Sequence, residues 1–373
     1  MEKQMTAIIK VVGDFCNLRC KYCFYHGKNQ SVKSIMKFDL LEKFITEYMT
    51  LFSNNLFIWH GGEPLLAGIN FFEKVMYTQQ KFNGANRKVK NTIQTNATLI
   101  TDDWAKFFKA NKFGVGVSLD GNEKSHNRFR VTADGNGTFD KVIKGIEILR
   151  RNGIHPGIIQ TLTRANISDT EDNFRFFTET LGLKGWGTNF FYQFSSQTKI
   201  DNQKITNAEM IKFLKKIIDL WLKKDDSCLR IREIENFSLG VLGKKALNCT
   251  FNSECDRYFC VDYDGLIYPC DRKSGNFENA FGNLKKHNLK SILGNQKRLE
   301  YVKSSKILPT DCLVCEWKIF CNNGCTANRE GGENGKFYYC EARKEVFSYL
   351  REKINSVLKE VHHGKECDFG FNG

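Results

Sequence analysis

The stretch that decides the fold is GDFCNLRCKYCFYHG, residues 13–27, in which three cysteines follow a CxxxCxxC spacing. A structural zinc ion takes four ligands, and a cubane iron–sulfur cluster also prefers four thiolates. Three thiolates would leave one iron of a cubane open to a small molecule. The alternative at this point is a zinc site that a distant histidine, such as His26 or His60, completes.

Length and cysteine usage indicate a protein of a reducing compartment. The chain has 373 residues, enough for a large α/β domain, a smaller unit and a sizeable core, so stability does not require cross-links. The first 16 residues contain no signal-peptide core, and no later stretch has the apolar length of a membrane span. We therefore expect a cytoplasmic protein, without a membrane partner, whose 14 cysteines bind metal or do redox chemistry.

The formal net charge of +14 favours a solvated, lysine-rich surface. The alternative is a nucleic acid or an acidic peptide as partner. The lysine pairs are scattered, as Lys223–Lys224 and Lys244–Lys245 illustrate, and no basic block carries interleaved aromatic residues. Bound anionic metal clusters would also offset part of the charge. Nucleic acid is therefore the less favoured partner.

Short β-branched or aromatic runs alternate with amphipathic helical windows from residue 6 to about residue 196. The predicted strands are 7–12, 55–62, 90–96, 114–121, 156–163 and 186–194. The predicted helices are 40–52, 71–82, 102–111, 139–152 and 169–182. Six such units predict a parallel sheet with right-handed crossovers, short of the eight units of a closed barrel. The fold class is therefore α/β, a partial (β/α)6 TIM-like barrel, with the CxxxCxxC at its catalytic C-terminal edge.

The remainder of the chain has a different pattern. We predict a barrel domain over 1–198, a helical bridge over 199–247 with 207–224 its clearest amphipathic segment, and a cysteine-rich domain over 248–373. A helix over 341–361 closes that last domain. Proline is scarce, so no proline-rich linker separates the parts, and we expect them to pack together.

CNLRCKYCFY, residues 16–25, resembles the signature of the radical S-adenosylmethionine (radical SAM) family, in which an aromatic residue, here Tyr22, precedes the third cysteine. The resemblance implies that Cys16, Cys20 and Cys23 hold a 4Fe–4S cluster whose open iron chelates the amino and carboxylate groups of SAM. One electron then cleaves SAM to a 5′-deoxyadenosyl radical. The implied partner is an external one-electron donor such as flavodoxin or ferredoxin.

Later segments of the chain resemble radical SAM segments and occur in the same order along the sequence. HGGEP at 60–64 resembles the family's GGE segment, so Gly61 and Gly62 would let the backbone approach the ligand and Glu63 would bind the methionine ammonium. Alone, this segment could be an ordinary strand-to-helix turn. TNAT at 95–98 ends the third predicted strand in the corresponding way.

The fourth predicted strand ends in SLDG at 118–121. By resemblance Ser118 contacts SAM through its ribose or carboxylate, whereas Asp120 orders the turn. Arg130 matches a position that can pair with the SAM carboxylate, a contact that suits a guanidinium. The alternative for Arg130 is a surface arginine.

Eight further cysteines resemble the SPASM extension of peptide-modifying radical SAM enzymes. Eight thiolates can ligate two more cubane clusters, which makes three 4Fe–4S clusters in all. By position, the first auxiliary cluster would be held by Cys249, Cys255, Cys270 and Cys325. The second would be held by Cys312, Cys315, Cys321 and Cys340. Two zinc sites of the zinc-ribbon kind are the alternative.

Three cysteines remain without a role: Cys228, Cys260 and Cys367. Free thiols in a reducing compartment are most often structural. Cys260 lies close in sequence to the expected ligands and could replace one of the first auxiliary cluster.

Asp271, in YPCD at 268–271, is the candidate catalytic residue. By resemblance to anaerobic sulfatase-maturing enzymes, an aspartate beside the ligand Cys270 takes the proton that the substrate loses on oxidation. The alternative is that Asp271 orders the cluster loop.

The similarity to these maturases extends through YCFYH, FFEKVM, DDWAKFFKANKF and all eight auxiliary cysteine spacings. It implies an enzyme that abstracts hydrogen from a side-chain carbon of a peptide or protein and oxidises a cysteine or serine in a sulfatase to formylglycine. Two departures lie near the expected cavity. His60 stands where those enzymes tend to carry glutamine, and Arg272 where an apolar or aromatic residue is expected.

These departures keep an alternative open, the oxidative cross-linking of a ribosomally made precursor peptide (RiPP) through a thioether or carbon–carbon bond. Cross-linking enzymes commonly bring a separate leader-binding domain, and too few residues precede the first strand for one, which favours sulfatase maturation. A different class, a non-catalytic iron–sulfur electron carrier, would need neither an open iron nor a GGE segment. The charge suggests a tRNA-modifying role, but the twin auxiliary clusters fit peptides better.

Overall fold

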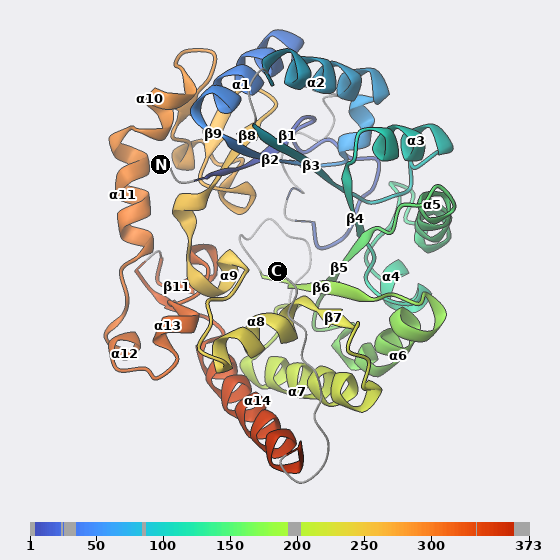
Figure 1. The fold of residues 1–373 in the computed structure, drawn as a ribbon, viewed down its shortest axis with the longest axis vertical. Helices are drawn as coiled ribbons and strands as arrows, with labels where there is room; N and C mark the ends of the chain where they lie inside the picture. The colour runs from blue at the N-terminus through green and yellow to red at the C-terminus, as the bar shows by residue number, and fades with distance from the viewer. Residues whose placement is uncertain are drawn as a thin grey trace.

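The structure, a computed structural model, describes residues 4–23, 25, 35–83, 87–192, 203–332 and 334–361, without the side chains of 357–361. Six parallel strands alternate with helices that lie outside them (Figure 1). The strands are β1 (Thr6–Lys10), β2 (Asn54–His60), β3 (Lys88–Thr95), β4 (Gly114–Ser118), β5 (Gly157–Leu162) and β6 (Gly185–Phe190). The main helices between them are α1 (Phe38–Leu51), α2 (Ile69–Phe82), α3 (Asp102–Ala110), α5 (Phe139–Arg151) and α6 (Thr170–Arg175). The predicted partial barrel is confirmed.

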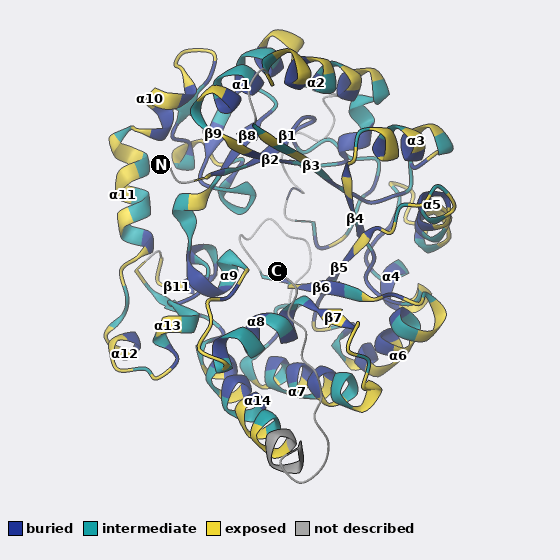
Figure 2. Cartoon of the chain, viewed as in Figure 1, coloured by how far each residue is buried: buried dark blue, intermediate teal, exposed yellow. Residues whose placement is uncertain are grey.

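Burial alternates along β2 and shows which side chains face the helices and which face the interior of the barrel. Phe57 and Trp59 are fully buried against the helix layer, whereas Ile58 and His60 point to the other face and are only partly buried. The helices turn their buried faces toward the sheet and their exposed faces outward (Figure 2). The C-terminal end of β2 therefore presents His60 to the interior of the barrel.

The sheet does not stop at the six predicted strands. Two residues of the predicted bridge form β7 (Arg230–Ile231), parallel to β6. At the other edge, β8 (Tyr258–Asp262) pairs parallel with β1, and β9 (Leu266–Tyr268) and β10 (Gly282–Asn283) follow antiparallel. One sheet of ten strands results, in the order β10-β9-β8-β1-β2-β3-β4-β5-β6-β7. The cysteine-rich region thus shares the sheet of the barrel.

The shared sheet also gives a shared core. Phe259 of β8 is fully buried, and its ring centroid lies 6.4 Å from that of Phe44 and 5.5 Å from that of Tyr48, both on α1. Phe57 of β2 packs edge-on against the same two α1 rings. The expectation that the parts pack together is confirmed.

Helices of the bridge and of the C-terminal end pack against one another below the sheet in Figure 1. They are α7 (Asn207–Lys224), α8 (Arg232–Val241) and α14 (Cys340–Val361). Thr206 and Glu209 form a capping box that begins α7. Phe347 of α14 lies 4.9 Å, ring to ring, from Phe237 of α8. The predicted boundary at residue 198 lies outside the described residues, and the domain limits stay predictions.

The rest of the cysteine-rich region consists of short elements. They are α9 (Cys249–Asn252), α10 (Leu289–Leu293), α11 (Gln296–Ser305), α12 (Thr310–Leu313), α13 (Lys318–Cys321), and the small hairpin of β11 (Arg329–Glu330) and β12 (Lys336–Phe337). None of the helices described here is long and apolar enough to cross a membrane.

Candidate active site

Three thiols gather in the loop that follows β1. Burial raises the pKa of Cys16, and the charges of Glu63, Cys20 and Cys23 raise it further. Burial and the neighbouring Cys20 raise the pKa of Cys23 to about 12. Arg130 opposes these effects at Cys20 and Cys23, but burial outweighs it and keeps the thiols protonated, whereas a bound metal would ionise them. The donor set therefore suits a cationic metal cluster.

Backbone hydrogen bonds hold this loop from one side. The N–H of Arg19 donates to the carbonyl of Val131 at 2.7 Å, and the N–H of Lys21 donates to the carbonyl of Phe129 at 2.9 Å. From the end of β3, the Asn96 side chain donates to Asn17 Oδ1 at 2.9 Å and to the sulfur of Cys16 at 3.8 Å. Segments that are distant in sequence thus fix the loop that carries the thiols.

The GGE segment holds the loop from the other side. The N–H of Gly62 donates to Gly13 O at 2.8 Å, and that of Glu63 donates to Phe15 O at 2.9 Å. A Cβ atom at Gly62 would lie 1.9 Å from the Phe15 carbonyl oxygen, and Gly61 has a φ of +110°. The close approach that excludes a side chain here is to the cysteine loop, whereas the sequence suggested an approach to the ligand.

Glu63 is fully buried at the end of this segment. Its carboxylate accepts hydrogen bonds from Leu65 N at 3.1 Å, Thr95 Oγ1 at 2.7 Å and Asn96 N at 2.7 Å. All three donors are neutral, and burial raises the pKa of Glu63 to about 7. A ligand ammonium beside the Glu63 carboxylate would supply the missing positive charge. Glu63 therefore fits the methionine ammonium of SAM, the group expected from the sequence.

Tyr22, Asp120 and Arg130 form a buried triad. The Tyr22 hydroxyl donates to Asp120 Oδ2, and Arg130 Nε lies 3.0 Å from the same oxygen. The Arg130 guanidinium also lies 5.4 Å from the centroid of the Tyr22 ring. Burial opposes the charge of Arg130, but Asp120, Tyr22 and Cys20 outweigh it and raise the pKa of Arg130. Arg130 is therefore a buried ion-pair partner, and the surface-arginine alternative is wrong.

The carboxylate of Asp120 also orders the ends of the neighbouring strands. Its Oδ1 accepts a hydrogen bond from Thr161 N of β5 at 2.9 Å. Ser118, at the end of β4, is partly buried, and its hydroxyl accepts a hydrogen bond from Gln94 Nε2 of β3 at 3.0 Å. Ser118, Glu63 and Arg130 thus lie at the C-terminal ends of the strands, as the barrel topology requires.

Asp271 follows β9 and begins a short turn, Asp271–Lys273, in which it is partly buried. Burial and the charge of Asp271 raise the pKa of Tyr25, which is two residues beyond Cys23. Burial lowers the pKa of His60, and the charge of Asp271 opposes that change. His60 Nδ1 is buried and forms no hydrogen bond with the described residues. Asp271 therefore lies close enough to Tyr25 and His60 for its charge to act on both side chains.

The first auxiliary set, Cys249, Cys255, Cys270 and Cys325, comes from four separate segments. Burial and the nearby Cys325 and Cys255 raise the pKa of Cys249 to about 12, although Arg272 opposes them. The charge of Cys325 also raises the pKa of Cys255 and of Cys270. These thiols are thus brought together around Cys325.

The second auxiliary set, Cys312, Cys315, Cys321 and Cys340, lines one cavity. Across the described residues, no three cysteine, histidine or carboxylate side chains are arranged to hold a single metal ion. His26, which the zinc alternative named as a ligand, is not among the described residues. Cys260 packs with Ile8 and Tyr268 and is fully buried, Cys228 is exposed, and Cys367 is not among the described residues.

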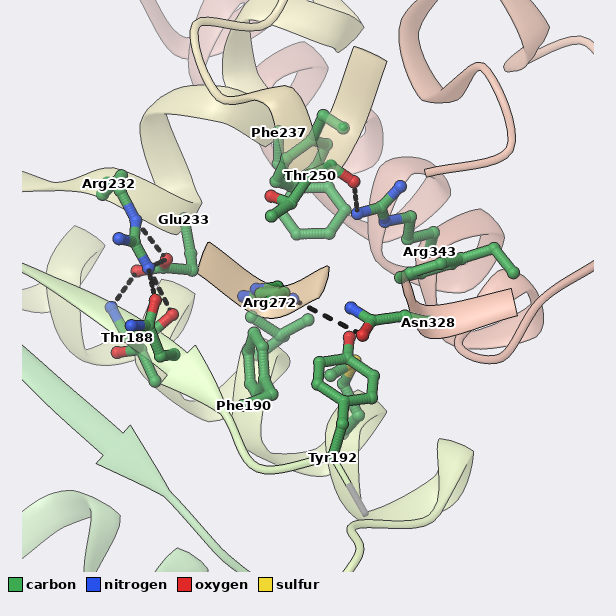
Figure 3. A pocket seen from close by; sticks show the side chains of 15 residues that line it. Thr188, Phe190, Tyr192, Arg232, Glu233, Phe237, Thr250, Arg272, Asn328 and Arg343 are labelled. Atoms are coloured by element: carbon green, nitrogen blue, oxygen red, sulfur yellow. Dashed lines mark hydrogen bonds and ion pairs between the residues drawn. The ribbon is translucent and has the colours of Figure 1, made fainter. Parts of the chain in front are cut away.

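A cavity of about 40 Å³ is lined by residues of β6 and by residues of the cysteine-rich region (Figure 3). Its walls include Arg232, Arg272 and Arg343, and the Arg272 guanidinium lies 3.4 Å from Asn328 Oδ1. The sequence singled out Arg272 only as a departure from the expected residue type and did not indicate Arg343. The signal for Arg343 was its position one helical turn after Cys340.

The comparisons with known proteins agree with this geometry. Residues 11–177 match the Radical SAM superfamily, and residues 249–316 match SPASM, an iron–sulfur cluster-binding domain. The cysteine-type anaerobic sulfatase-maturating enzyme of Clostridium perfringens is 32% identical over 96% of this chain and 99% of that protein. The serine-type anaerobic sulfatase-maturating enzyme of Bacteroides thetaiotaomicron is 28% identical over 96% of this chain and 92% of that protein.

A solved structure shows the same fold with ligands bound. Native anSMEcpe with bound AdoMet and Cp18Cys peptide superimposes with a TM-score of 0.85 at 31% identity, over 96% of this chain and all of that one. AdoMet is S-adenosylmethionine, the cofactor that the CxxxCxxC motif implied. The chain therefore belongs to the radical SAM enzymes with a SPASM domain, in the family of the anaerobic sulfatase-maturating enzymes.

Proposed function

We propose that this enzyme oxidises a cysteine side chain of a sulfatase to formylglycine. The observation that carries the proposal is the position of Asp271, a carboxylate one residue beyond Cys270 whose charge acts on Tyr25 and His60 near the cysteine loop. The full-length similarity to a cysteine-type maturase supports cysteine as the target, and the weaker similarity to a serine-type maturase keeps serine as a second substrate to test. Family membership sets aside the non-catalytic electron carrier.

The proposed cofactors are SAM and three 4Fe–4S clusters. Cys16, Cys20 and Cys23 would hold the cluster that binds SAM, and the two auxiliary sets would hold the others. When bound, SAM and its cluster supply the radical that removes a hydrogen atom from the substrate. The electron donor would be flavodoxin or ferredoxin, and the enzyme would act in a reducing cytoplasm, where cysteines stay available as metal ligands.

Three side chains would hold SAM in the barrel. Glu63 would accept the methionine ammonium, because its buried carboxylate has only neutral donors. Arg130 would contact the SAM carboxylate with the N–H groups that Asp120 does not use. Ser118 would contact the ribose or carboxylate, and Tyr22 would keep Asp120 and Arg130 in position.

Asp271 would act as the base. Loss of a hydrogen atom, an electron and a proton from the Cβ and thiol of the substrate leaves a carbon–sulfur double bond. Water then replaces the sulfur, which leaves as hydrogen sulfide, and an aldehyde remains. The proton would pass to Asp271. Cys249, Cys255, Cys270 and Cys325 would hold the first auxiliary cluster, which would supply an acceptor for the electron.

A second candidate function is the cross-linking of a precursor peptide, which His60 favours. Its Nδ1 is a buried polar atom without a hydrogen bond among the described residues, at a position where the maturases tend to have glutamine. A substrate group could form a hydrogen bond with Nδ1 of His60 in either reaction. The products, in contrast, differ in composition.

The deciding experiment is anaerobic. Reconstituted enzyme, SAM and a reductant would be mixed with a sulfatase-motif peptide that carries cysteine, with its serine counterpart, and with any small peptide encoded beside the gene. Tandem mass spectrometry should show loss of sulfur and gain of an aldehyde on the cysteine peptide. Loss of two hydrogens with all heteroatoms retained, on the neighbouring peptide alone, would establish cross-linking instead.

A further inference from the structure

Arg343, in the first turn of α14, lies between the two auxiliary sets. Its side chain is 6% exposed. Nη1 donates to the sulfur of Cys321, a member of the second set, at 3.3 Å. Nη2 donates to the carbonyl of Thr250 at 2.7 Å, the residue after Cys249 of the first set (Figure 3). One guanidinium therefore joins the loops that carry the two sets.

The surroundings fix the orientation of this guanidinium. Its Cζ lies 4.2 Å from the ring centroid of Phe251 and 4.0 Å from that of Phe337. Cys340 precedes Arg343 by one turn of the same helix, so both side chains lie on one face and line the same cavity. Gly324 has a φ of +56°, and a Cβ there would lie 2.8 Å from Arg343 Nη1. The absence of a side chain at Gly324 thus leaves room for the Arg343 guanidinium.

The charge of Arg343 has no carboxylate beside it. Its two acceptors are a sulfur and a carbonyl oxygen, and within the described part of the chain no aspartate or glutamate forms an ion pair with it. A buried guanidinium without a counter-charge is costly. The four cysteines of the second set would supply negative charge once they ligate a cluster as thiolates.

We propose that Arg343 is a positioning residue of the second auxiliary cluster and raises its reduction potential. Hydrogen bonds to the ligand sulfurs and a nearby positive charge both stabilise the more negative, reduced cluster. The bond to Thr250 keeps the same guanidinium against the first auxiliary loop, so both sets are held in one arrangement. The inference rests on the proposed function, since it takes Cys312, Cys315, Cys321 and Cys340 as ligands.

The test uses the full-length enzyme reconstituted with iron and sulfide. Redox titration followed by EPR would compare the wild type with Arg343→Met, Arg343→Lys and Arg351→Met. Arg351 is the matched control, an exposed arginine of the same helix that pairs with Glu316 and lies 4.6 Å from the ring centroid of Trp317. The cluster whose spectrum changes when SAM is added is the internal reference.

In Arg343→Met the midpoint potential of one auxiliary cluster should become more negative, with a smaller shift in Arg343→Lys and none in Arg351→Met. Unchanged potentials in fully loaded Arg343→Met would overturn the proposal. Arg343→Met could also lose the iron of one cluster. In that case, full iron loading of Arg343→Lys would support a role for the positive charge. Iron loss in both variants would show that Arg343 acts through packing alone and would overturn the proposal. A Cys321→Ala variant that keeps all its iron would refute the ligand assignment itself.

Discussion

Lys10 and Asp262 form a buried ion pair, with Lys10 Nζ 3.2 Å from Asp262 Oδ2, that joins the first strand of the barrel to the cysteine-rich region. Lys10 is fully buried and also lies 2.8 Å from Asp14 and 3.3 Å from Ser274 Oγ. Burial acts to lower the pKa of Lys10, but Asp262 and Asp14 outweigh it and raise that pKa. The lysine is therefore charged in the folded protein.

Lys10→Met should destabilise the fold by about 3–5 kcal/mol, because it leaves the buried carboxylate of Asp262 and the partly buried carboxylate of Asp14 without their cation. The midpoint of urea unfolding and the melting temperature would measure this. The control is Lys81→Met, which removes a lysine that is half exposed and pairs with Glu42 at the surface. That change should cost about 0–1 kcal/mol. Equal effects of the two substitutions would show that the buried pair contributes nothing special.

Gly62→Ala should displace the cysteine loop, because the added Cβ would meet the carbonyl of Phe15 at 1.9 Å. We expect a lower melting temperature and loss of the iron of one cluster, measured by iron and sulfide content after reconstitution. Gly157→Ala is the control, since nothing lies within 4 Å of its Cβ position. That control should be neutral or stabilising by about 0.4–1 kcal/mol. Normal iron content in Gly62→Ala would contradict the account of the GGE segment.

Glu63→Gln should weaken SAM binding by about 1.5–3 kcal/mol, the range for a hydrogen bond to a charged group. This corresponds to an increase in Kd of about 10- to 150-fold. Anaerobic calorimetric titration of the reconstituted enzyme with SAM would measure it. Glu73→Gln, an exposed glutamate of α2, is the control. A Kd that stays the same in both variants would remove Glu63 from the proposed SAM site.

Asp271→Asn should still form 5′-deoxyadenosine but yield product about 10²–10⁴-fold more slowly, the usual contribution of a general base. Cys20→Ala should abolish both, since it removes a proposed ligand of the cluster that binds SAM. Chromatography of deoxyadenosine and mass spectrometry of the peptide would follow the two products in one reaction. If Asp271→Asn loses deoxyadenosine to the same extent as product, Asp271 is not the base.

The sequence predicted the barrel because each of its strands and helices has a clear hydrophobic period over its own residues. It predicted neither β7, which is two residues long, nor the pairing of β8 with β1, since hydrophobic periodicity carries no signal for a strand pairing this distant. The grouping of the auxiliary thiols came from the resemblance of the cysteine order to the SPASM extension. The sequence did not indicate that Gly62 packs against Phe15, because that contact depends on how two loops meet in space.

Residue type alone did not indicate the surroundings of two arginines. A surface position was the alternative for Arg130, yet Asp120 and the face of the Tyr22 ring allow its burial. Arg343 follows an expected ligand in an amphipathic helix, where an arginine is usually a solvated residue. Only the fold shows that its side chain turns inward to Cys321.

The pairing of β1 with both β2 and β8 has a consequence for synthesis of the chain. β1 leaves the ribosome well before its partner β8, which ends 252 residues later than Lys10, at Asp262. At about 5–20 residues per second, one edge of β1 waits on the order of 10–50 s for its neighbour. An unpaired edge invites association with other chains. The sheet beside the cysteine loop is thus completed only after Asp262 has emerged from the ribosome.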